Sequence, residues 1–279
     1  MIELLSIDEI SVISDWAELN VVYNFTSLSK AKLVSLLEHN GYDKDTDYEG
    51  DALFDSILQE LEKRQLLYGN NPPYDVSKGI IIPLINWTDF PEYLLCLIFS
   101  YWGAANSHAG TKLFEHISDI ALKNYLNGET IILGFPNIEN LPSQLDNLAT
   151  LLIEERGAKN PPVHAKDRGI DVIGWKSFSD GRKGQIIVLM QCAAGRNWNL
   201  KKQILIDVWS QYINWNFYTT IPSMSITEIL PIKKWSDATE TYGIIFDRAR
   251  IYKNLYTPNT SIEENLRAGV IQWCSEKLK

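Results

Sequence analysis

The sequence predicts an α/β fold, because strand patterns alternate with helical ones along the chain. Asp180-Gly181 lies between two runs rich in β-branched and apolar residues, which indicates a hairpin since Asp and Gly tolerate the positive φ of tight turns. Apolar residues recur at helical spacing before and after this hairpin. The 279 residues are 45% hydrophobic, so they can bury a core and form one large domain or two smaller ones.

The first part of the chain, residues 1–109, is expected to be acidic and mainly helical. Tyr93 to Trp102 is apolar nearly all round, which favours a helix buried in a core or an interface. Gly41 to Asp51 is acidic and poor in apolar residues, as is typical of a solvated loop. The other elements expected here are a strand at 20–25, helices at 29–38 and 52–67, and a strand or helix at 79–85.

The second part, residues 110–279, is expected to contain the mixed sheet and the helices that flank it. Asp247 is placed to cap a helix, and Ser261 to Glu264 has the pattern of a capping box that opens a terminal helix. The elements expected here are a helix that opens at 110 and stops before Gly128, a helix at 143–156, hairpin strands at 170–175 and 185–193, a helix at 200–214, a loop at 233–235, a strand at 241–246 and helices after 247 and from 261 to 277.

The net charge of -9 is unevenly distributed. Residues 151–279 carry 18 Lys and Arg against 13 Asp and Glu, whereas residues 1–150 carry 8 against 22. Only the second half is therefore suited to face a polyanion. No leader pattern follows Met1, no apolar run approaches the length of a membrane span, and the three cysteines are far apart, so we expect a cytoplasmic protein with no membrane partner, disulfide framework or zinc site.

The hairpin register brings an acid opposite an amide. If the loop runs from Asp180 to Arg182, Asp171 on the first strand falls opposite Gln191 on the second. Directly opposed side chains share a face and lie close enough to hold one ion between them. A loop longer or shorter by one residue would turn Gln191 to the other face, so the register decides whether this pair exists.

These strands resemble the core of the PD-(D/E)XK nuclease superfamily, in particular its Mrr-like restriction-endonuclease branch. In that branch a G-[IV]-D-[VL]-I strand precedes a hairpin and a strand ending in Q-x-K or E-x-K. Residues 169–173 (Gly-Ile-Asp-Val-Ile) match the first motif, and 188–191 (Val-Leu-Met-Gln) match the second. The resemblance covers about a third of the chain and departs at Ala193, where the family has its lysine.

The resemblance implies a restriction-endonuclease-like mixed sheet and a metal-dependent nuclease that uses Mg²⁺ or Mn²⁺ bound to Asp171 and Gln191. Nucleases of this branch often open with a helix bearing Phe-Glu, whose carboxylate reaches the metal, so Glu115 is the first choice for a third ligand. A solvated glutamate on an amphipathic helix is the competing interpretation. Asp146 ranks second, and Asp167 is either a ligand or a turn residue.

Because Ala193 stands where the resembled family has its lysine, either another residue supplies the cation or the chain has lost catalytic activity. Arg196, Lys201 and Lys202 follow the second strand, and the two lysines are expected in the first turn of the helix at 200–214, where they could meet a phosphate. Ordinary solvated cations are the alternative. Lys201 is the candidate catalytic cation, whereas Arg196, Lys202 and the loop residue Trp198 are candidate nucleic-acid contacts.

Other candidates in this part have weaker patterns. Cys192 follows a buried strand without an evident partner base, so a small core residue is expected rather than a nucleophile. His164 lacks the spacing of a catalytic pair. Arg248 and Arg250 are expected either to meet phosphate or to pair with Asp247 or Glu240.

The leading hypothesis is a metal-dependent endonuclease acting on DNA in bacterial or phage-related defence. The overall acidity favours a partner that brings the chain to DNA, such as a helicase or a DNA-recognition subunit. The sequence is also compatible with an oligomer. One alternative is a degenerate nuclease fold that binds nucleic acid or protein without cutting, as Ala193 and Gln191 suggest. Another is a structural or regulatory subunit whose charge asymmetry serves a protein interface.

Overall fold

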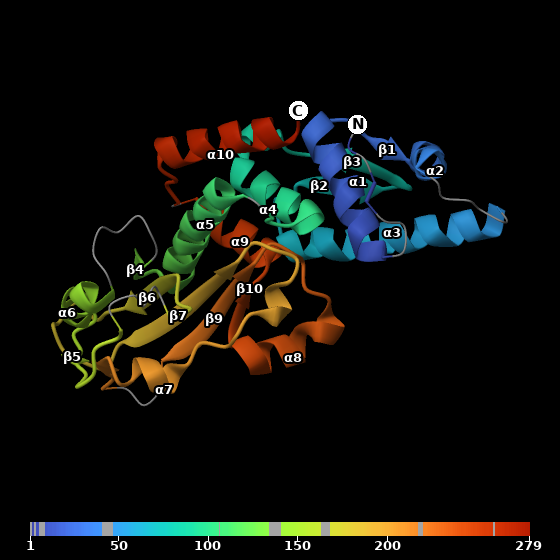
Figure 1. Cartoon of the computed structure of the whole chain (residues 1–279). Coiled ribbons are helices and arrows are strands. Elements are labelled where there is room, and N and C mark those ends of the chain that lie inside the picture. The colour runs from blue at the N-terminus through green and yellow to red at the C-terminus, as the bar shows by residue number, and fades with distance from the viewer. Residues whose placement is uncertain are drawn as a thin grey trace.

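The structure is a computed structural model of the chain. It describes residues 2, 4–5, 9–40, 47–105, 107–133, 141–162, 168–216, 220–258 and 260–279, and for 47–51 the backbone alone. Within these residues, helices and one five-stranded mixed sheet make up an α/β fold (Figure 1). None of the helices in this part of the chain combines the length and the apolar composition needed to cross a membrane.

The five-stranded sheet has the order β10-β9-β7-β6-β4. β4, β6 and β7 are antiparallel neighbours, whereas β7, β9 and β10 run parallel. The strands are β4 (Glu129–Ile132), β6 (Val172–Lys176), β7 (Ile186–Ala193), β9 (Ile221–Ile226) and β10 (Ile244–Phe246). β7 is central and buried almost throughout, as its continuous apolar run requires.

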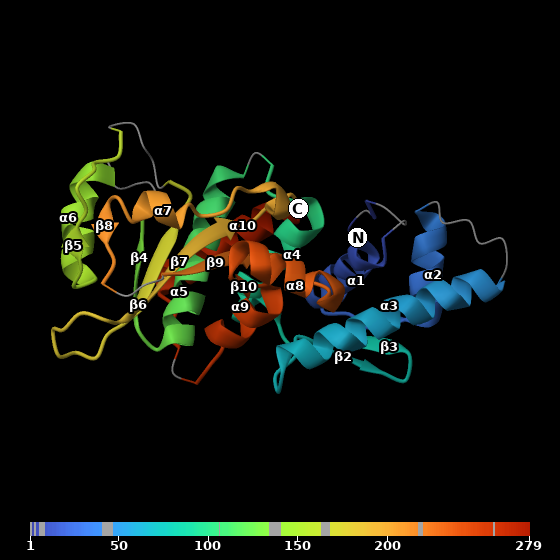
Figure 2. The same ribbon diagram turned by 90° about the horizontal axis from the view of Figure 1, so that it is seen from below.

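Helices cover both faces of this sheet (Figures 1 and 2). One face packs against α5 (His108–Leu126) and α9 (Arg248–Leu255), with Val188 and Met190 in the shared core. The other face is covered by α6 (Leu141–Leu151), α7 (Ile206–Trp209) and α8 (Ile232–Tyr242). Leu189 faces this second layer, so the alternation along β7 sorts its side chains between two cores.

The N-terminal part adds helices and a small antiparallel sheet beside α4 and α9 (Figure 1). The helices are α1 (Ile10–Asn24), α2 (Lys30–His39), α3 (Asp47–Tyr68) and α4 (Pro91–Trp102), and the sheet has the order β1 (Leu28–Ser29), β3 (Ile80–Pro83), β2 (Tyr74–Ser77). The terminal helix α10 (Glu264–Lys277) packs on α4 and α5. One continuous apolar cluster joins this part to the α5 face of the large sheet, so the proposed boundary at Gly110 lies inside a shared core.

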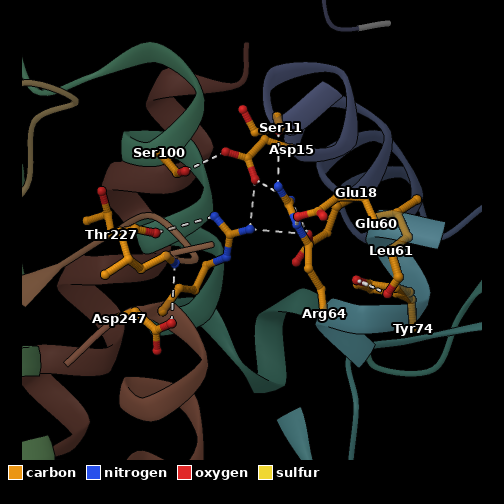
Figure 3. Close-up of polar contacts among 12 residues, drawn as sticks. Ser11, Asp15, Glu18, Glu60, Leu61, Arg64, Tyr74, Ser100, Thr227 and Asp247 are labelled. Atoms are coloured by element: carbon orange, nitrogen blue, oxygen red, sulfur yellow. Dashed lines mark hydrogen bonds and ion pairs between the residues drawn. The ribbon is translucent and has the colours of Figure 1, made fainter. Parts of the chain in front are cut away.

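Four buried charges bind the two parts together, and we call them the arginine cluster (Figure 3). Arg64 of α3 and Arg248 of α9 both bond to Asp15 and Glu18 of α1, at N–O distances of 2.7 and 3.3 Å for Arg64 and 2.8 and 3.2 Å for Arg248. Arg248 and Glu18 are fully buried. Burial alone would raise the pKa of Asp15, but Arg248, Arg64 and the hydroxyl of Ser100 lower it below its usual range.

Most of the predicted elements are confirmed. The hairpin forms between β6 and β7, and the helices expected at 29–38, 52–67, 93–102 and 110–127 appear as α2, α3, α4 and α5. The segment at 79–85 contains the strand β3. Asp247 caps α9, because its carboxylate accepts a hydrogen bond from the Arg250 backbone at 3.0 Å.

Several predicted elements are wrong. The strand expected at 20–25 is the end of α1, which is buried on nearly all sides. The helix expected at 200–214 is replaced by the 3-10 helix η2 (Trp198–Leu200), α7 and β8 (Ile213–Asn214), because β8 pairs with β5 (Glu155–Arg156). That pairing also shortens the helix expected at 143–156. α10 begins at Glu264 without a side-chain cap, and α8 replaces the loop at 233–235.

Candidate active site

Asp171 is fixed between two strands at the start of β6. Its N–H donates to Met190 O at 2.9 Å, and its carbonyl accepts from the Leu133 N–H at 2.9 Å. The ladder pairs Val172 with Met190, as the predicted register requires, but it ends there: the Asp171 N–H bonds Met190 O, and no pairing of Asp171 with Gln191 follows in the described ladder. The carboxylate turns toward β7, where Oδ2 accepts the Cys192 N–H at 2.6 Å.

Gln191 does not meet Asp171 in a common pocket. Its side chain is buried, and Oε1 has no hydrogen-bond partner among the described residues. Along β7, Met190 and Cys192 pack toward the α5 face, and alternation turns Gln191 to the other face. Asp171 lies one residue outside β6, and its carboxylate bonds the Cys192 amide. The side chains of Asp171 and Gln191 therefore do not form one ligand site.

A pocket of about 400 Å³ contains three of the four predicted catalytic residues, and we call it the small pocket. Glu115 of α5, Asp171 at the start of β6 and Lys201 after η2 all line it, together with Cys192 and Ala193 of β7. Burial raises the pKa of the Cys192 thiol well above its usual value, and the charges of Asp171 and Glu115 raise it further. The Cys192 thiol therefore lines an acidic pocket in its protonated form and does not act as a nucleophile.

Glu115 is partly buried on the pocket side of α5. Its Oε2 forms an ion pair with Lys112 Nζ at 2.7 Å, one helical turn earlier, and its side chain is 14% exposed. The low exposure separates Glu115 from a fully solvated glutamate. Lys112 is a cation beside the pocket that sequence reasoning missed, although its i, i+3 spacing from Glu115 is the usual signal for such a pair.

Lys201 reaches the pocket from the segment that follows β7. Its Nζ donates to the Cys192 carbonyl at 2.6 Å. Ala193, where the resembled family has its lysine, lines the same pocket. An ammonium from position 201 is thus available where one from position 193 is missing. Lys201 ends η2 instead of opening a helix, so the helix start expected to present N–H groups here is absent from the described residues around it.

A larger cavity of about 1090 Å³ adjoins the small pocket, and we call it the large cavity. Ala104, Gly195, Asn197 and Trp198 line both. Arg196 is exposed on the wall of the large cavity, whereas Trp198 is only 8% exposed, because its indole N–H donates to Glu228 Oε2 at 3.1 Å. Lys202 is exposed and lines neither space.

The remaining candidates lie away from the small pocket or outside the described residues. Asp146 forms an exposed ion pair with Arg156 at 2.7 Å. Trp209 is fully buried in the α6–α7 core, as expected. Arg248 pairs with Asp15 and Glu18 instead of Asp247, Glu240 or a phosphate. His164, Lys166 and Asp167 are outside the described residues.

The donors of the small pocket fit a hard divalent cation. Within the described ranges, no three His, Cys, Asp or Glu side chains converge as a metal group. Two carboxylates, Asp171 and Glu115, nevertheless line one pocket, whereas the Cys192 carbonyl already accepts from the Lys201 ammonium. Mg²⁺ is commonly held by one or two carboxylates while it keeps several waters, so this set suits Mg²⁺ or Mn²⁺ better than a softer metal.

Comparisons with protein-family models, with curated proteins and with solved structures find no match to this chain. The arguments about function therefore depend on the residues and geometry of the small pocket and of the large cavity.

Proposed function

We propose that the chain is a metal-dependent nuclease of the restriction-endonuclease-like type that hydrolyses phosphodiester bonds, in DNA, in a bacterial or phage-related defence role. One observation carries the proposal: Glu115, Asp171 and Lys201, which come from three separate segments, line one pocket. Two acids that can hold a metal ion and a lysine that can stabilise negative charge suit metal-dependent hydrolysis of a phosphodiester. A mixed sheet flanked by helices also supports this type of fold.

Each residue of the small pocket has a role in the proposed reaction. Asp171 is held rigidly by the Cys192 amide, so its other oxygen has a fixed direction. Glu115 orients the attacking water, and its ion pair with Lys112 at 2.7 Å holds the carboxylate in place. Lys201 stabilises the charge on the phosphate and the leaving oxygen. Asp171 and Glu115 would hold Mg²⁺ or Mn²⁺, which when bound neutralises the phosphodiester and lowers the pKa of a bound water.

Contacts outside the small pocket favour a nucleic acid as substrate. Arg196 and Lys202, which flank Trp198 in the sequence, are both exposed, and exposed cations suit a phosphate backbone. The net charge of -9 opposes binding to a polyanion, so we propose that a helicase or a DNA-recognition subunit assists the approach to DNA.

Cleavage assays on the purified chain test the proposal. Plasmid DNA, single-stranded DNA and RNA are incubated with Mg²⁺ or Mn²⁺, and products are resolved by electrophoresis. We expect metal-dependent cutting that Asp171→Asn lowers at least about 100-fold, because the variant removes a charged ligand. Asp146→Asn is the matched control, since it removes an exposed carboxylate far from the pocket and should leave the rate unchanged.

Two adjacent lysines separate a catalytic role from a general electrostatic one. Lys201→Met should lower the rate about 100-fold or more, because the ammonium is lost from the pocket. Lys202→Met should lower it only a few-fold and in a salt-dependent way, since Lys202 is exposed and lines no pocket. Cutting that Asp171→Asn leaves intact, or equal effects of the two lysine substitutions, would contradict the assigned site.

One observation favours a second candidate function. Gln191 does not line the small pocket, and the Lys201 ammonium already bonds the Cys192 carbonyl, so fewer oxygens face a metal than two strands could supply. This arrangement suits a degenerate nuclease fold that binds nucleic acid without cutting. Binding of labelled DNA with no cleavage under any metal condition would support this alternative.

A further inference from the structure

The large cavity adjoins the small pocket and has room for a ligand. Its volume of about 1090 Å³ is slightly above the usual range for small-molecule sites. The two spaces share the wall formed by Ala104, Gly195, Asn197 and Trp198. A ligand that places one group in the small pocket therefore extends naturally into the large cavity.

The floor of the large cavity is rigid and polar. Asp15, Arg64 and Ser100 line it, and all belong to or touch the arginine cluster (Figure 3). Arg64 donates to Asp15 at 2.7 Å, and Ser100 donates to the other Asp15 oxygen. Asp15 and Arg64 neutralise each other, so the floor accepts a polar group more readily than an isolated charge.

Aromatic side chains form one wall and connect it to the catalytic lysine. Trp198 meets Tyr242 edge-on, with ring centroids 5.9 Å apart, and Trp102 lines the same cavity. The Tyr242 hydroxyl donates to the carbonyls of Asn199 and Lys201, at 2.9 and 3.1 Å. A group that binds against Trp198 is thus positioned by the same contacts that place Lys201 at the small pocket.

The charges of the large cavity are mixed. Arg196 and Lys234 are exposed cations on its wall, whereas Glu9 and Asp237 are exposed acids. Glu228 lies deeper and is half-buried, and burial raises the pKa of its carboxyl group. One of its oxygens holds the Trp198 indole, and an N–H group of a bound base could donate to the carboxylate. Exposed cations for a phosphate, the half-buried ring of Trp102 for a base and an inner acceptor are the features of a nucleotide site.

We propose that the large cavity binds one unpaired nucleotide of the substrate, next to the phosphate in the small pocket. The inference rests on the proposed nuclease function and narrows its substrate. A base that is still paired within a duplex cannot enter a cavity of this kind, so the substrate is a single strand or a strand whose nucleotide has been turned out of the helix.

Binding measured without metal tests this inference separately from cleavage. A fluorescein-labelled single-stranded 12-mer deoxyoligonucleotide and its blunt duplex are titrated with the intact chain in EDTA, and fluorescence anisotropy is recorded. We expect the single strand to bind about tenfold more tightly than the duplex. Ala105→Trp places an indole at an exposed position of the cavity wall and should weaken single-strand binding about tenfold.

Matched variants keep the result interpretable. Ser236→Trp adds the same side chain at an exposed position of α8 that does not line the cavity, so binding should stay within about twofold. Arg196→Ala should weaken binding and flatten its salt dependence without affecting the core. Equal affinity for single strand and duplex, or equal binding by the two tryptophan variants, overturns the inference even if the chain cuts DNA. Binding that Ala105→Trp abolishes supports the site even if no DNA is cut.

Discussion

Arg248 offers the sharpest test of how the two parts of the chain are held together. It is fully buried and donates to Asp15 Oδ1 at 2.8 Å, Glu18 Oε2 at 3.2 Å, Tyr68 Oη at 3.1 Å and Thr227 O at 3.3 Å. Arg248→Met fills a similar volume but leaves two buried carboxylates opposed by Arg64 alone. Removing one partner of a buried ion pair costs about 3–5 kcal/mol, which is about a fifth or more of the stability of an ordinary domain.

Urea unfolding, followed by tryptophan fluorescence and linear extrapolation, measures this cost. Arg250→Met is the matched control on the same helix, because Arg250 is exposed and its stacking on Trp235 contributes about 1 kcal/mol or less. Adding Glu18→Gln to Arg248→Met restores charge balance and keeps an acceptor for the Tyr68 and Tyr93 hydroxyls, so it should recover about 1–2 kcal/mol. A loss no larger than that of Arg250→Met, or a double variant no more stable than the single one, would refute the reasoning.

Three further predictions concern stability and reactivity. Gly243→Ala should lower the free energy of unfolding in urea by at least about 2 kcal/mol, because the new Cβ would lie 2.0 Å from Pro222 O at a φ of +79°. Gly181→Ala has a φ of +69° and open space around it within the described chain, so it should cost about 1 kcal/mol, and equal losses would contradict the close approach at Gly243. The folded pKa of Asp15 lies below its ordinary value of 3.8, so the stabilisation that its carboxylate contributes is complete above pH 3.8 and is lost as the pH falls through the folded pKa. The urea concentration at the midpoint of unfolding should therefore change less with acidic pH in Asp15→Asn than in the wild type. Burial raises the pKa of all three cysteine thiols, that of Cys96 to about 12. Ellman's reagent at neutral pH should therefore label the native chain slowly and the urea-unfolded chain at three sites. Rapid labelling of the native chain would contradict the burial of the thiols.

The parts of the fold that depend on local sequence could be predicted. The β6–β7 hairpin was predicted from its turn residues and flanking strands, and the ladder has the predicted register, although its connection spans 177–185 and not the three residues expected. The segment at 20–25 shows the limit of such patterns. Its Val21, Val22 and Tyr23 favour a strand locally, but α1 is buried on nearly all sides, and tertiary packing overrides the propensity.

Long-range partners account for most of what the sequence does not reveal. The segment after Leu200 has apolar residues at helical spacing, yet Ile213 pairs with Arg156 across a separate ladder, so the helix is interrupted. In the sequence, Asp15 and Glu18 resemble solvated acids. No residue close to them in the sequence indicates that they pair with arginines some 50 and 230 residues away.

The candidate site was predictable in composition but not in geometry. Glu115, Asp171 and Lys201 were identified from short motifs and from their place in the chain, and they line one pocket. Gln191 was assigned from the register, which is correct, but the carboxylate of Asp171 turns to a backbone amide instead. Trp198 was expected in an open loop, and its bond to Glu228 holds it largely buried.

The arginine cluster has a consequence for how the chain is made. During vectorial synthesis on the ribosome, α1 emerges some 230 residues before Arg248, the guanidinium that completes the neutralisation of its two acids. Until α9 has been translated, the early helices carry uncompensated negative charge and cannot complete their packing, so their apolar surface stays exposed, and exposed apolar surface invites chaperone binding. Nascent chains halted before α9 should accordingly be captured by chaperones or degraded, and chains that include it should fold.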